Sequence, residues 1–142
     1  MMKVFWVVLI FFLSLGACAK QPSYPEPPRM GNDVAVESAT LRPEVPVFFT
    51  YHYQGKKINF FVMKVEGRVL SFLDACARCY PAKRGYRFDG GRLVCRECNV
   101  NYSVSEIEKG MGSCFPIRIT GHLQDGKYLI PLSTLERMAE KF

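Results

Sequence analysis

Residues 73–98 read LDACARCYPAKRGYRFDGGRLVCREC, and this stretch contains two Cys-x-x-Cys pairs. The first pair is Cys76 and Cys79, the second is Cys95 and Cys98, and fifteen residues lie between the pairs. This spacing is typical of metal sites with four thiolate ligands, because the tight turn of each pair aims both sulfur atoms at one ion. Asn99 follows the second pair, where such a turn favours a residue that tolerates the left-handed conformation. The stretch therefore predicts a double CxxC knuckle of the zinc-ribbon or rubredoxin-like type.

Other cysteine chemistries fit this stretch less well. Attachment of c-type haem needs a histidine directly after CxxC, whereas Tyr80 and Asn99 occupy those positions. A thioredoxin-type redox pair needs a single CxxC that opens a helix within a βαβ unit, and the sequence has no such unit. Structural disulfides remain the main alternative, because exported compartments are oxidising.

Cys114 is a fifth cysteine downstream of both pairs, in the segment Gly110-Met111-Gly112-Ser113-Cys114-Phe115-Pro116. The glycines of this segment allow a close approach of the backbone. Three roles fit Cys114: a fifth metal ligand, a resolving thiol, or a free cysteine of the core.

The chain has 142 residues and a formal net charge of +6, with a calculated pI of about 9.1. Between Cys76 and Cys98, six basic residues stand against Asp89 and Glu97. Cations near thiols lower their pKa and offset the negative charge of a metal-thiolate centre, so this excess has a local explanation. Ordinary solvated surface charge explains it equally well. The remaining basic residues are scattered, so we expect no nucleic-acid partner.

The N-terminus is typical of a bacterial lipoprotein. Lys3 precedes an apolar run from Val4 to Leu15, which is too short to span a bilayer and is typical of a cleaved signal peptide. The residues Leu15-Gly16-Ala17-Cys18 resemble a lipobox, which implies a signal peptide over residues 1–17 and lipidation of Cys18. The resemblance to lipoproteins also implies a leaning towards the outer membrane, because Ala19 stands where an aspartate would retain such a protein in the inner membrane. We therefore expect a lipid-anchored protein of the cell envelope that faces the periplasm.

The rest of the chain predicts a tether followed by a small, mainly β domain of the α+β class. Six of the nine prolines fall between Pro22 and Pro46, so residues 18–44 are expected to be an extended tether and residues 45–142 the folded domain. Alternating apolar residues and turn sequences predict antiparallel strands, and a capping-box spacing predicts a short C-terminal helix. The expected strands are 47–53, 58–65 and 68–73 in a meander, a hairpin around Asp89-Gly90-Gly91, and a hairpin of 117–123 with 127–130. A further turn of helix is expected over residues 103–109.

Several motifs in this order resemble the membrane iron-sulfur-containing FtrD-like family. They are Phe60-Phe61-Val62, Leu73-Asp74-Ala75-Cys76-Ala77-Arg78-Cys79-Tyr80-Pro81, Lys83-Arg84-Gly85-Tyr86, Leu93-Val94-Cys95-Arg96-Glu97-Cys98 and Gly112-Ser113-Cys114-Phe115-Pro116. The resemblance covers about residues 45–142. It implies an iron-sulfur cluster or a related metal on Cys76, Cys79, Cys95, Cys98 and Cys114.

The resemblance also implies a setting for the protein. Members of the family are linked to iron-uptake systems that contain a periplasmic iron-binding protein, a cupredoxin-like protein and an iron permease. In those systems the family is expected to pass electrons. We therefore expect an electron carrier or accessory of iron uptake rather than an enzyme, holding an iron-sulfur cluster or a single iron. A structural zinc ribbon that mediates protein binding, and a thiol-disulfide or metal-delivery protein, are the alternatives.

Overall fold

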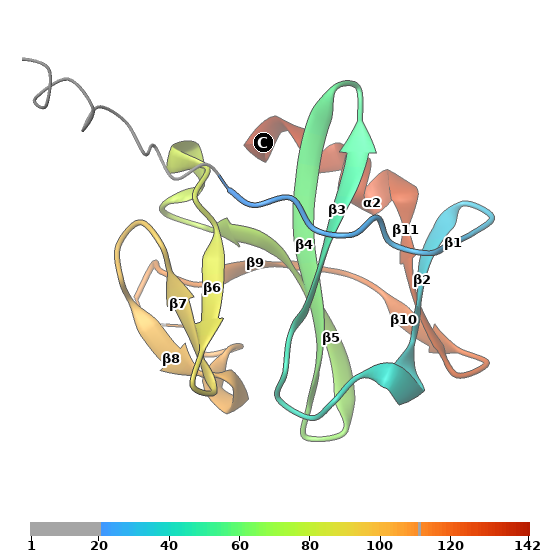
Figure 1. Ribbon diagram of the computed structural model, residues 1–142, viewed down its shortest axis with the longest axis horizontal. Coiled ribbons are helices and arrows are strands. Elements are labelled where there is room, and N and C mark those ends of the chain that lie inside the picture. Colours follow the sequence, from blue (N-terminus) through green and yellow to red (C-terminus); the bar gives the residue numbers. More distant parts are fainter. Residues whose placement is uncertain (1–20, 111) are drawn as a thin grey trace, which may run out of the picture.

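The computed structural model describes residues 21–110 and 112–142, which form three antiparallel sheets (Figure 1). The first sheet has the order β1 (Arg29–Met30), β2 (Asp33–Glu37), β11 (Lys127–Pro131) and β10 (His122–Gln124). The second has the order β3 (Val47–Tyr53), β4 (Lys56–Val65), β5 (Arg68–Cys76) and β9 (Pro116–Ile119). The third has the order β6 (Tyr86–Asp89), β7 (Arg92–Cys95) and β8 (Asn101–Ser103).

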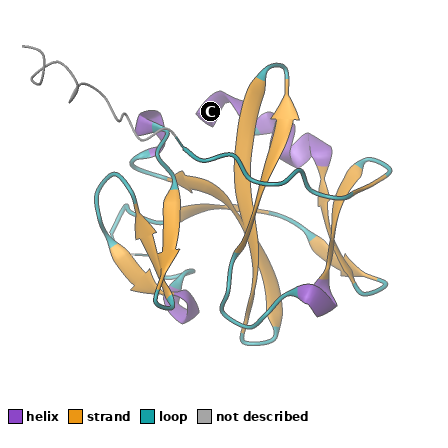
Figure 2. Ribbon diagram, viewed as in Figure 1, coloured by secondary structure: helices purple, strands orange, loops and turns teal. Residues whose placement is uncertain are grey.

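Short helical segments connect or end these strands (Figure 2). The single described α-helix is α2 (Leu132–Arg137), in the C-terminal part of residues 112–142. Turns of 3-10 helix occur at η1 (Ser38–Thr40), η2 (Tyr80–Ala82), η3 (Val104–Glu106) and η4 (Ala139–Lys141). The expected mainly β architecture with a short C-terminal helix is therefore confirmed.

The second sheet is buried on both faces, which explains the long apolar run of β4. Side chains of a strand alternate between the two faces of its sheet. On β4, Ile58, Phe60 and Val62 enter the core shared with the first sheet, whereas Phe61 and Met63 enter the core shared with the third sheet. The protein therefore has two hydrophobic cores, and the second sheet lies between them (Figure 1).

The local strand predictions agree with the structure, while two longer elements differ. The expected meander corresponds to β3, β4 and β5, and the Asp89-Gly90-Gly91 turn joins β6 to β7. The expected hairpin with residues 127–130 is present, since β10 pairs with β11, but its first strand does not extend over 117–123: the chain leaves the second sheet after β9 and enters the first sheet at β10. Residues 103–109 form only the 3-10 turn η3 rather than the expected helix.

The C-terminal helix begins differently from the prediction. Pro131 occupies its N-cap position and no side chain caps it, so the expected capping box of Ser133 and Glu136 does not form. Glu136 instead accepts a hydrogen bond from the hydroxyl of Tyr51, which lies on β3. The tertiary contact with the second sheet therefore takes the side chain that would have capped the helix.

The expected tether is largely part of the folded domain. Strand β2, which falls inside residues 18–44, pairs along its length with β11. Upstream of β2, the backbone amide of Tyr24 donates to the hydroxyl of Thr50 at 2.8 Å, and the amide of Thr50 donates to the Pro25 carbonyl at 3.1 Å. The predicted domain boundary at residue 45 is therefore too late, because prolines here lie in an extended segment that packs on the second sheet. The signal peptide and Cys18 lie outside the described residues.

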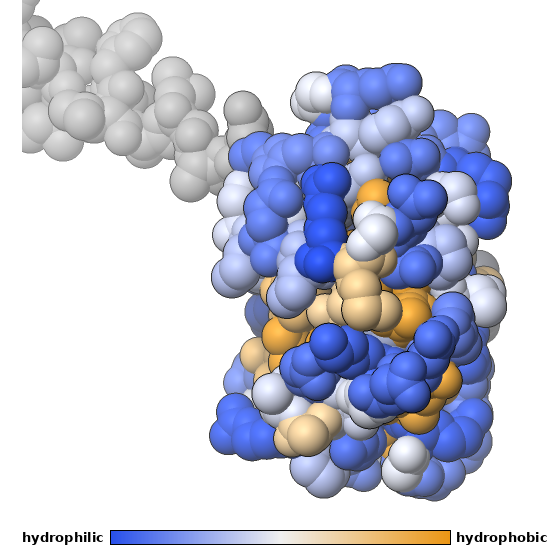
Figure 3. All heavy atoms as spheres, turned by 90° about the vertical axis from the view of Figure 1, so that its right-hand side faces the viewer, coloured by the Kyte–Doolittle hydropathy of each residue, from blue (hydrophilic) through white to orange (hydrophobic). Residues whose placement is uncertain are grey.

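The surface on the side of the first sheet is mainly hydrophilic (Figure 3). Hydrophobic atoms form a limited strip between charged groups in this view, and Met30 on β1 and Leu123 on β10 are exposed large hydrophobic residues of this sheet. Within residues 21–110 and 112–142, no helix has the length and hydropathy required to cross a bilayer.

Candidate metal centre

Three separate segments bring cysteines to the core between the second and third sheets. Cys76 ends β5, Cys79 follows in the turn before η2, and Cys95 ends β7. Cys114 lies two residues before the start of β9. Pairing of Pro116 with Cys76 in the ladder between β5 and β9 places it beside the end of β5. The amide of Ala77 also donates to the carbonyl of Phe115 at 2.9 Å, which fixes the Cys114 segment against the first CxxC turn.

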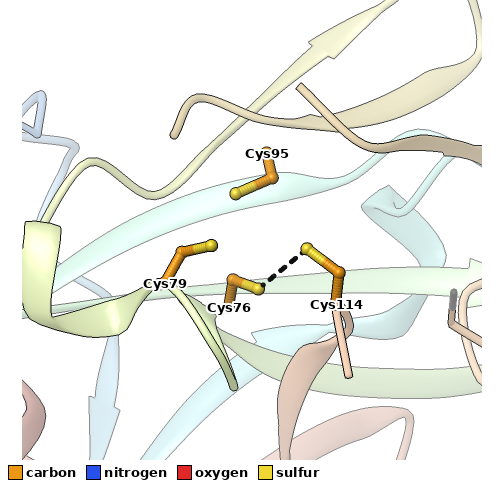
Figure 4. A group of neighbouring side chains, drawn as sticks. All are labelled: Cys76, Cys79, Cys95 and Cys114. Atoms are coloured by element: carbon orange, nitrogen blue, oxygen red, sulfur yellow. Dashed lines mark hydrogen bonds between the residues drawn. The ribbon is translucent and has the colours of Figure 1, made fainter. Parts of the chain in front are cut away.

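The sulfur atoms of Cys76, Cys79, Cys95 and Cys114 all lie within 4.8 Å of one another (Figure 4). The Cys76 and Cys114 sulfurs are 3.2 Å apart. Cys76, Cys95 and Cys114 are buried and Cys79 is half-buried, so the group sits at the edge of the core with limited access to solvent. Four thiols in this arrangement can hold a single metal ion or the iron of a thiolate-bound cluster.

Cys98 is exposed and lies beside this group rather than within it. Its sulfur is 2.8 Å from the Cys114 sulfur. The two CxxC pairs therefore do not contribute equally: Cys114 joins Cys76, Cys79 and Cys95 in the compact group, and Cys98 contacts that group from the solvent side.

In the second CxxC turn, the residue after the pair has the left-handed conformation that the sequence predicts. Asn99 has φ of +58°, the left-handed conformation expected directly after the pair. Its amide donates to the Cys95 carbonyl at 3.0 Å, and the Cys95 amide donates to the Val100 carbonyl at 2.9 Å. These bonds fix the direction in which Cys95 leaves the strand.

The five thiols differ in their tendency to lose a proton. Burial raises the pKa of Cys76, but hydrogen bonding from Cys114 and from backbone amides outweighs it and lowers the pKa to about 7. Burial raises the pKa of Cys79 to about 12, and burial also raises the pKa of Cys95 and of Cys114. The pKa of Cys98 is lowered by hydrogen bonding from Cys114 and backbone in spite of burial. Without a metal, most of the compact group is therefore protonated at neutral pH.

Asp74, two residues before Cys76, is a buried acidic residue near the site. It is 1% exposed, and its carboxylate accepts a hydrogen bond from the Tyr86 amide at 2.6 Å. Burial raises the pKa of this carboxyl to about 6, although its hydrogen bonds oppose the shift. Gln21 donates to the Asp74 side chain at 2.9 Å and to its carbonyl at 2.7 Å. One acidic residue thus connects β5, β6 and the N-terminal segment.

Some of the basic residues between Cys76 and Cys98 have specific partners. Arg84 forms an ion pair with Glu97 at 3.1 Å, which links the segment after the first pair to the second pair. Arg96 donates from its side chain to the Tyr86 carbonyl at 3.0 Å and from its amide to the Gly85 carbonyl at 2.9 Å. These two arginines therefore stabilise the loops that carry the thiols, a role that the charge count alone did not predict.

The site contains two residues that the sequence did not single out. Asp74 had a detectable signal, because it is an acidic residue within the otherwise apolar end of β5. Gln21 had none, because its contact depends on how the N-terminal segment crosses the second sheet. Cys18, the predicted lipidation site, lies outside the described residues.

The donor set fits a metal that prefers sulfur. Only thiols make up the compact group, and soft thiolate ligands select zinc, copper(I) and iron–sulfur centres. Sulfurs at the corners of a tetrahedron around one ion lie roughly 3.8 Å apart, given a metal–sulfur distance of about 2.3 Å. The limit of 4.8 Å within the group is therefore compatible with tetrahedral coordination of one ion by Cys76, Cys79, Cys95 and Cys114.

Comparison with known proteins identifies the family. Residues 41–142 match the family model described as "Membrane iron-sulfur containing protein FtrD-like". Searches of curated proteins and of solved structures found no match. The match includes all five cysteines of the site and most of the described chain. The chain therefore belongs to the FtrD-like family of membrane iron-sulfur containing proteins.

Proposed function

We propose that this protein is a lipid-anchored electron carrier of the bacterial cell envelope that holds iron on Cys76, Cys79, Cys95 and Cys114. The observation that carries the proposal is the convergence of four thiols from three chain segments within 4.8 Å. Iron in thiolate coordination supplies a one-electron couple, with a potential set by nearby charge, burial and hydrogen bonds to sulfur. The chain's part is to hold the four sulfurs in a partly buried site and to keep charged groups beside it.

The setting of the proposal is iron uptake. A periplasmic iron-binding protein, a cupredoxin-like protein and an iron permease are the proposed partners, and the family's membrane association supports this setting. A carrier that faces the periplasm from a lipid anchor would meet soluble and membrane-embedded partners alike. The leaning towards the outer membrane, from Ala19, is part of the same proposal.

The contact of Gln21 gives the proposed anchor a geometric consequence. Gln21 is bonded to Asp74, which is two residues before Cys76. Three residues of extended chain span at most about 11 Å, so a lipid on Cys18 would hold the bilayer surface close to the metal site. The proposed carrier would therefore exchange electrons near the membrane rather than at the end of a long tether.

A structural zinc site is the second candidate, and the compactness of the group favours it. Zinc in structural sites is held by four ligands in a tetrahedron, which needs no bridging sulfide between the thiols. Such a site would stabilise the small third sheet and the loops around it for protein binding. It would contribute directly to folding but would have no redox role.

Metal analysis with a visible spectrum, on protein purified without air, tests both candidates. Iron with a visible absorption that bleaches on reduction supports the carrier, and the presence of inorganic sulfide separates a cluster from a single iron. One zinc per chain without colour would replace the carrier by the structural site. Absence of any metal would contradict both and return the cysteines to thiol-disulfide chemistry.

The variants Cys114→Ser and Cys98→Ser form a matched pair for the ligand set. Both remove one sulfur and replace it by a hydroxyl, but only Cys114 belongs to the compact group. We expect Cys114→Ser to lose the metal and Cys98→Ser to retain it. Retention of metal by Cys114→Ser would show instead that the two CxxC pairs form the site.

A further inference from the structure

Two tyrosine hydroxyls are buried next to the cysteine group without a partner. Tyr86 is 0% exposed and Tyr102 is 3% exposed. Neither hydroxyl has a hydrogen-bond partner among the residues that the structure describes. Such groups are rare in native proteins, because leaving one unpaired costs about 1–3 kcal/mol. Phenylalanine would fill the same space without this cost, so the hydroxyls need an explanation.

Both tyrosines belong to the core that contains the thiols. Tyr86 begins β6 and is paired with Cys95 in the ladder between β6 and β7, while Tyr102 lies on β8. Their rings meet edge to face, with centroids 6.5 Å apart. Cys76, Cys95 and Cys114 are members of the same buried cluster. The unpaired hydroxyls are therefore buried in the same core as three of the four thiols of the compact group.

Tyr102 and Cys76 are the groups that act on the Tyr86 hydroxyl. Burial raises the pKa of Tyr86, and its neighbours Tyr102 and Cys76 raise it further. Burial also raises the pKa of Tyr102. A phenol hydroxyl can donate from its O–H and accept at its oxygen. A protonated thiol is a weak acceptor, whereas a metal-bound thiolate keeps negative charge and accepts more strongly.

We propose that Tyr86 donates a hydrogen bond to the sulfur of Cys76 when a metal is bound, and that Tyr102 donates to the Tyr86 oxygen. The inference rests on the metal site proposed above, but it does not depend on the metal being iron. In this arrangement both buried protons are used, and the Tyr86 bond withdraws electron density from one ligand. Tyr86 and Tyr102 are positioning residues that tune the centre. With iron, the added bond favours the more negative, reduced state and raises the potential.

The tyrosine-to-phenylalanine variants separate this role from simple packing. Tyr86→Phe removes the donor and leaves the ring in place. Tyr128→Phe is the matched control, because Tyr128 is also buried but its hydroxyl is already paired with Ser71 at 3.0 Å in the other core. In reduced, metal-free protein, we expect Tyr128→Phe to lower the unfolding temperature and Tyr86→Phe to leave it unchanged or raise it.

Cobalt(II) is the probe for the metal-bound form, since it takes tetrahedral thiolate sites and its thiolate-to-metal absorption reports on the sulfurs. We expect Tyr86→Phe to shift this band and to weaken cobalt binding at least tenfold in a chelator competition, as is typical when a partner of a metal ligand is removed. Tyr102→Phe should shift the band less, and Tyr128→Phe should not shift it. If the protein also binds redox-active iron, Tyr86→Phe should move its potential to a more negative value.

The outcomes distinguish this inference from the proposed function. A zinc-only protein would contradict the electron carrier but would leave the cobalt band and the affinity of Tyr86→Phe as valid tests. An unchanged band and affinity in Tyr86→Phe would overturn the inference, even if the wild-type protein carries iron. A fall in the metal-free unfolding temperature of Tyr86→Phe equal to that of Tyr128→Phe would overturn it as well, because the hydroxyl would then already have a partner.

Discussion

A methyl group added at Gly85 would collide with the carboxylate of Asp74, which lies two residues before Cys76. Gly85 has φ of +68°, and a Cβ built there would lie 2.6 Å from both carboxylate oxygens of Asp74. Carbon and oxygen atoms in ordinary contact are at least about 3.3 Å apart, so something must move by roughly 0.7 Å. The carboxylate cannot move without loss, because it is buried and bonded to the Tyr86 amide and to Gln21.

Gly85→Ala should therefore be destabilising for two separable reasons. The left-handed backbone costs alanine about 1–2 kcal/mol, and weakening of hydrogen bonds to the buried carboxylate costs about 1.5–3 kcal/mol more. Gly90→Ala is the matched control, because Gly90 also has positive φ, +53°, but has nothing within 4 Å of the added Cβ. The difference between the two variants should be about 2 kcal/mol, or roughly 8 °C in unfolding temperature for a domain of this size.

Urea and thermal unfolding of the reduced, metal-free protein measure this difference. A double-mutant cycle with Asp74→Ala isolates the steric part, since removing the carboxylate should make the alanine at position 85 no worse than the alanine at position 90. Equal stabilities of Gly85→Ala and Gly90→Ala would refute the reasoning. The Gly85 carbonyl also accepts the Arg96 amide next to Cys95, so Gly85→Ala should bind metal more weakly as well.

Two further predictions concern pH. Metal binding should release about one more proton per chain at pH 6 than at pH 8, because the pKa of Cys76 is about 7 and a ligand must be a thiolate; a pH-indicator titration giving equal counts would contradict this. Glu108→Gln should lower the free energy of unfolding at pH 7 by less than about 1 kcal/mol, since Glu108 forms exposed ion pairs with Arg68 and Arg118. The hydrogen bond from Arg68 holds the pKa of Glu108 below its usual value, so this stabilisation is present above that value and disappears as the pH falls through the lowered pKa. Equal effects of Glu108→Gln at pH 7 and pH 3 would argue against the ion pairs.

Local sequence patterns were sufficient to predict the strands and turns whose partners are close in the sequence. The meander of β3, β4 and β5 and the hairpin of β6 and β7 follow from alternating apolar residues around tight turns. The left-handed Asn99 follows from the requirement of the turn after a CxxC pair. These features depend on interactions between neighbours, so a window of a few residues contains the information that determines them.

The sequence by itself also predicted that the cysteines form a metal site, because two CxxC pairs at this spacing are typical of thiolate metal sites. Only the tertiary structure decided that Cys114 rather than Cys98 completes the compact group. That choice depends on the pairing of β9 with the end of β5, which brings together residues 38 positions apart. The same holds for the N-terminal segment, which packs on β3 because the second sheet offers it hydrogen-bond partners and an apolar surface. Pairings between distant segments depend on the fit of whole surfaces, and no local pattern of residues specifies that fit.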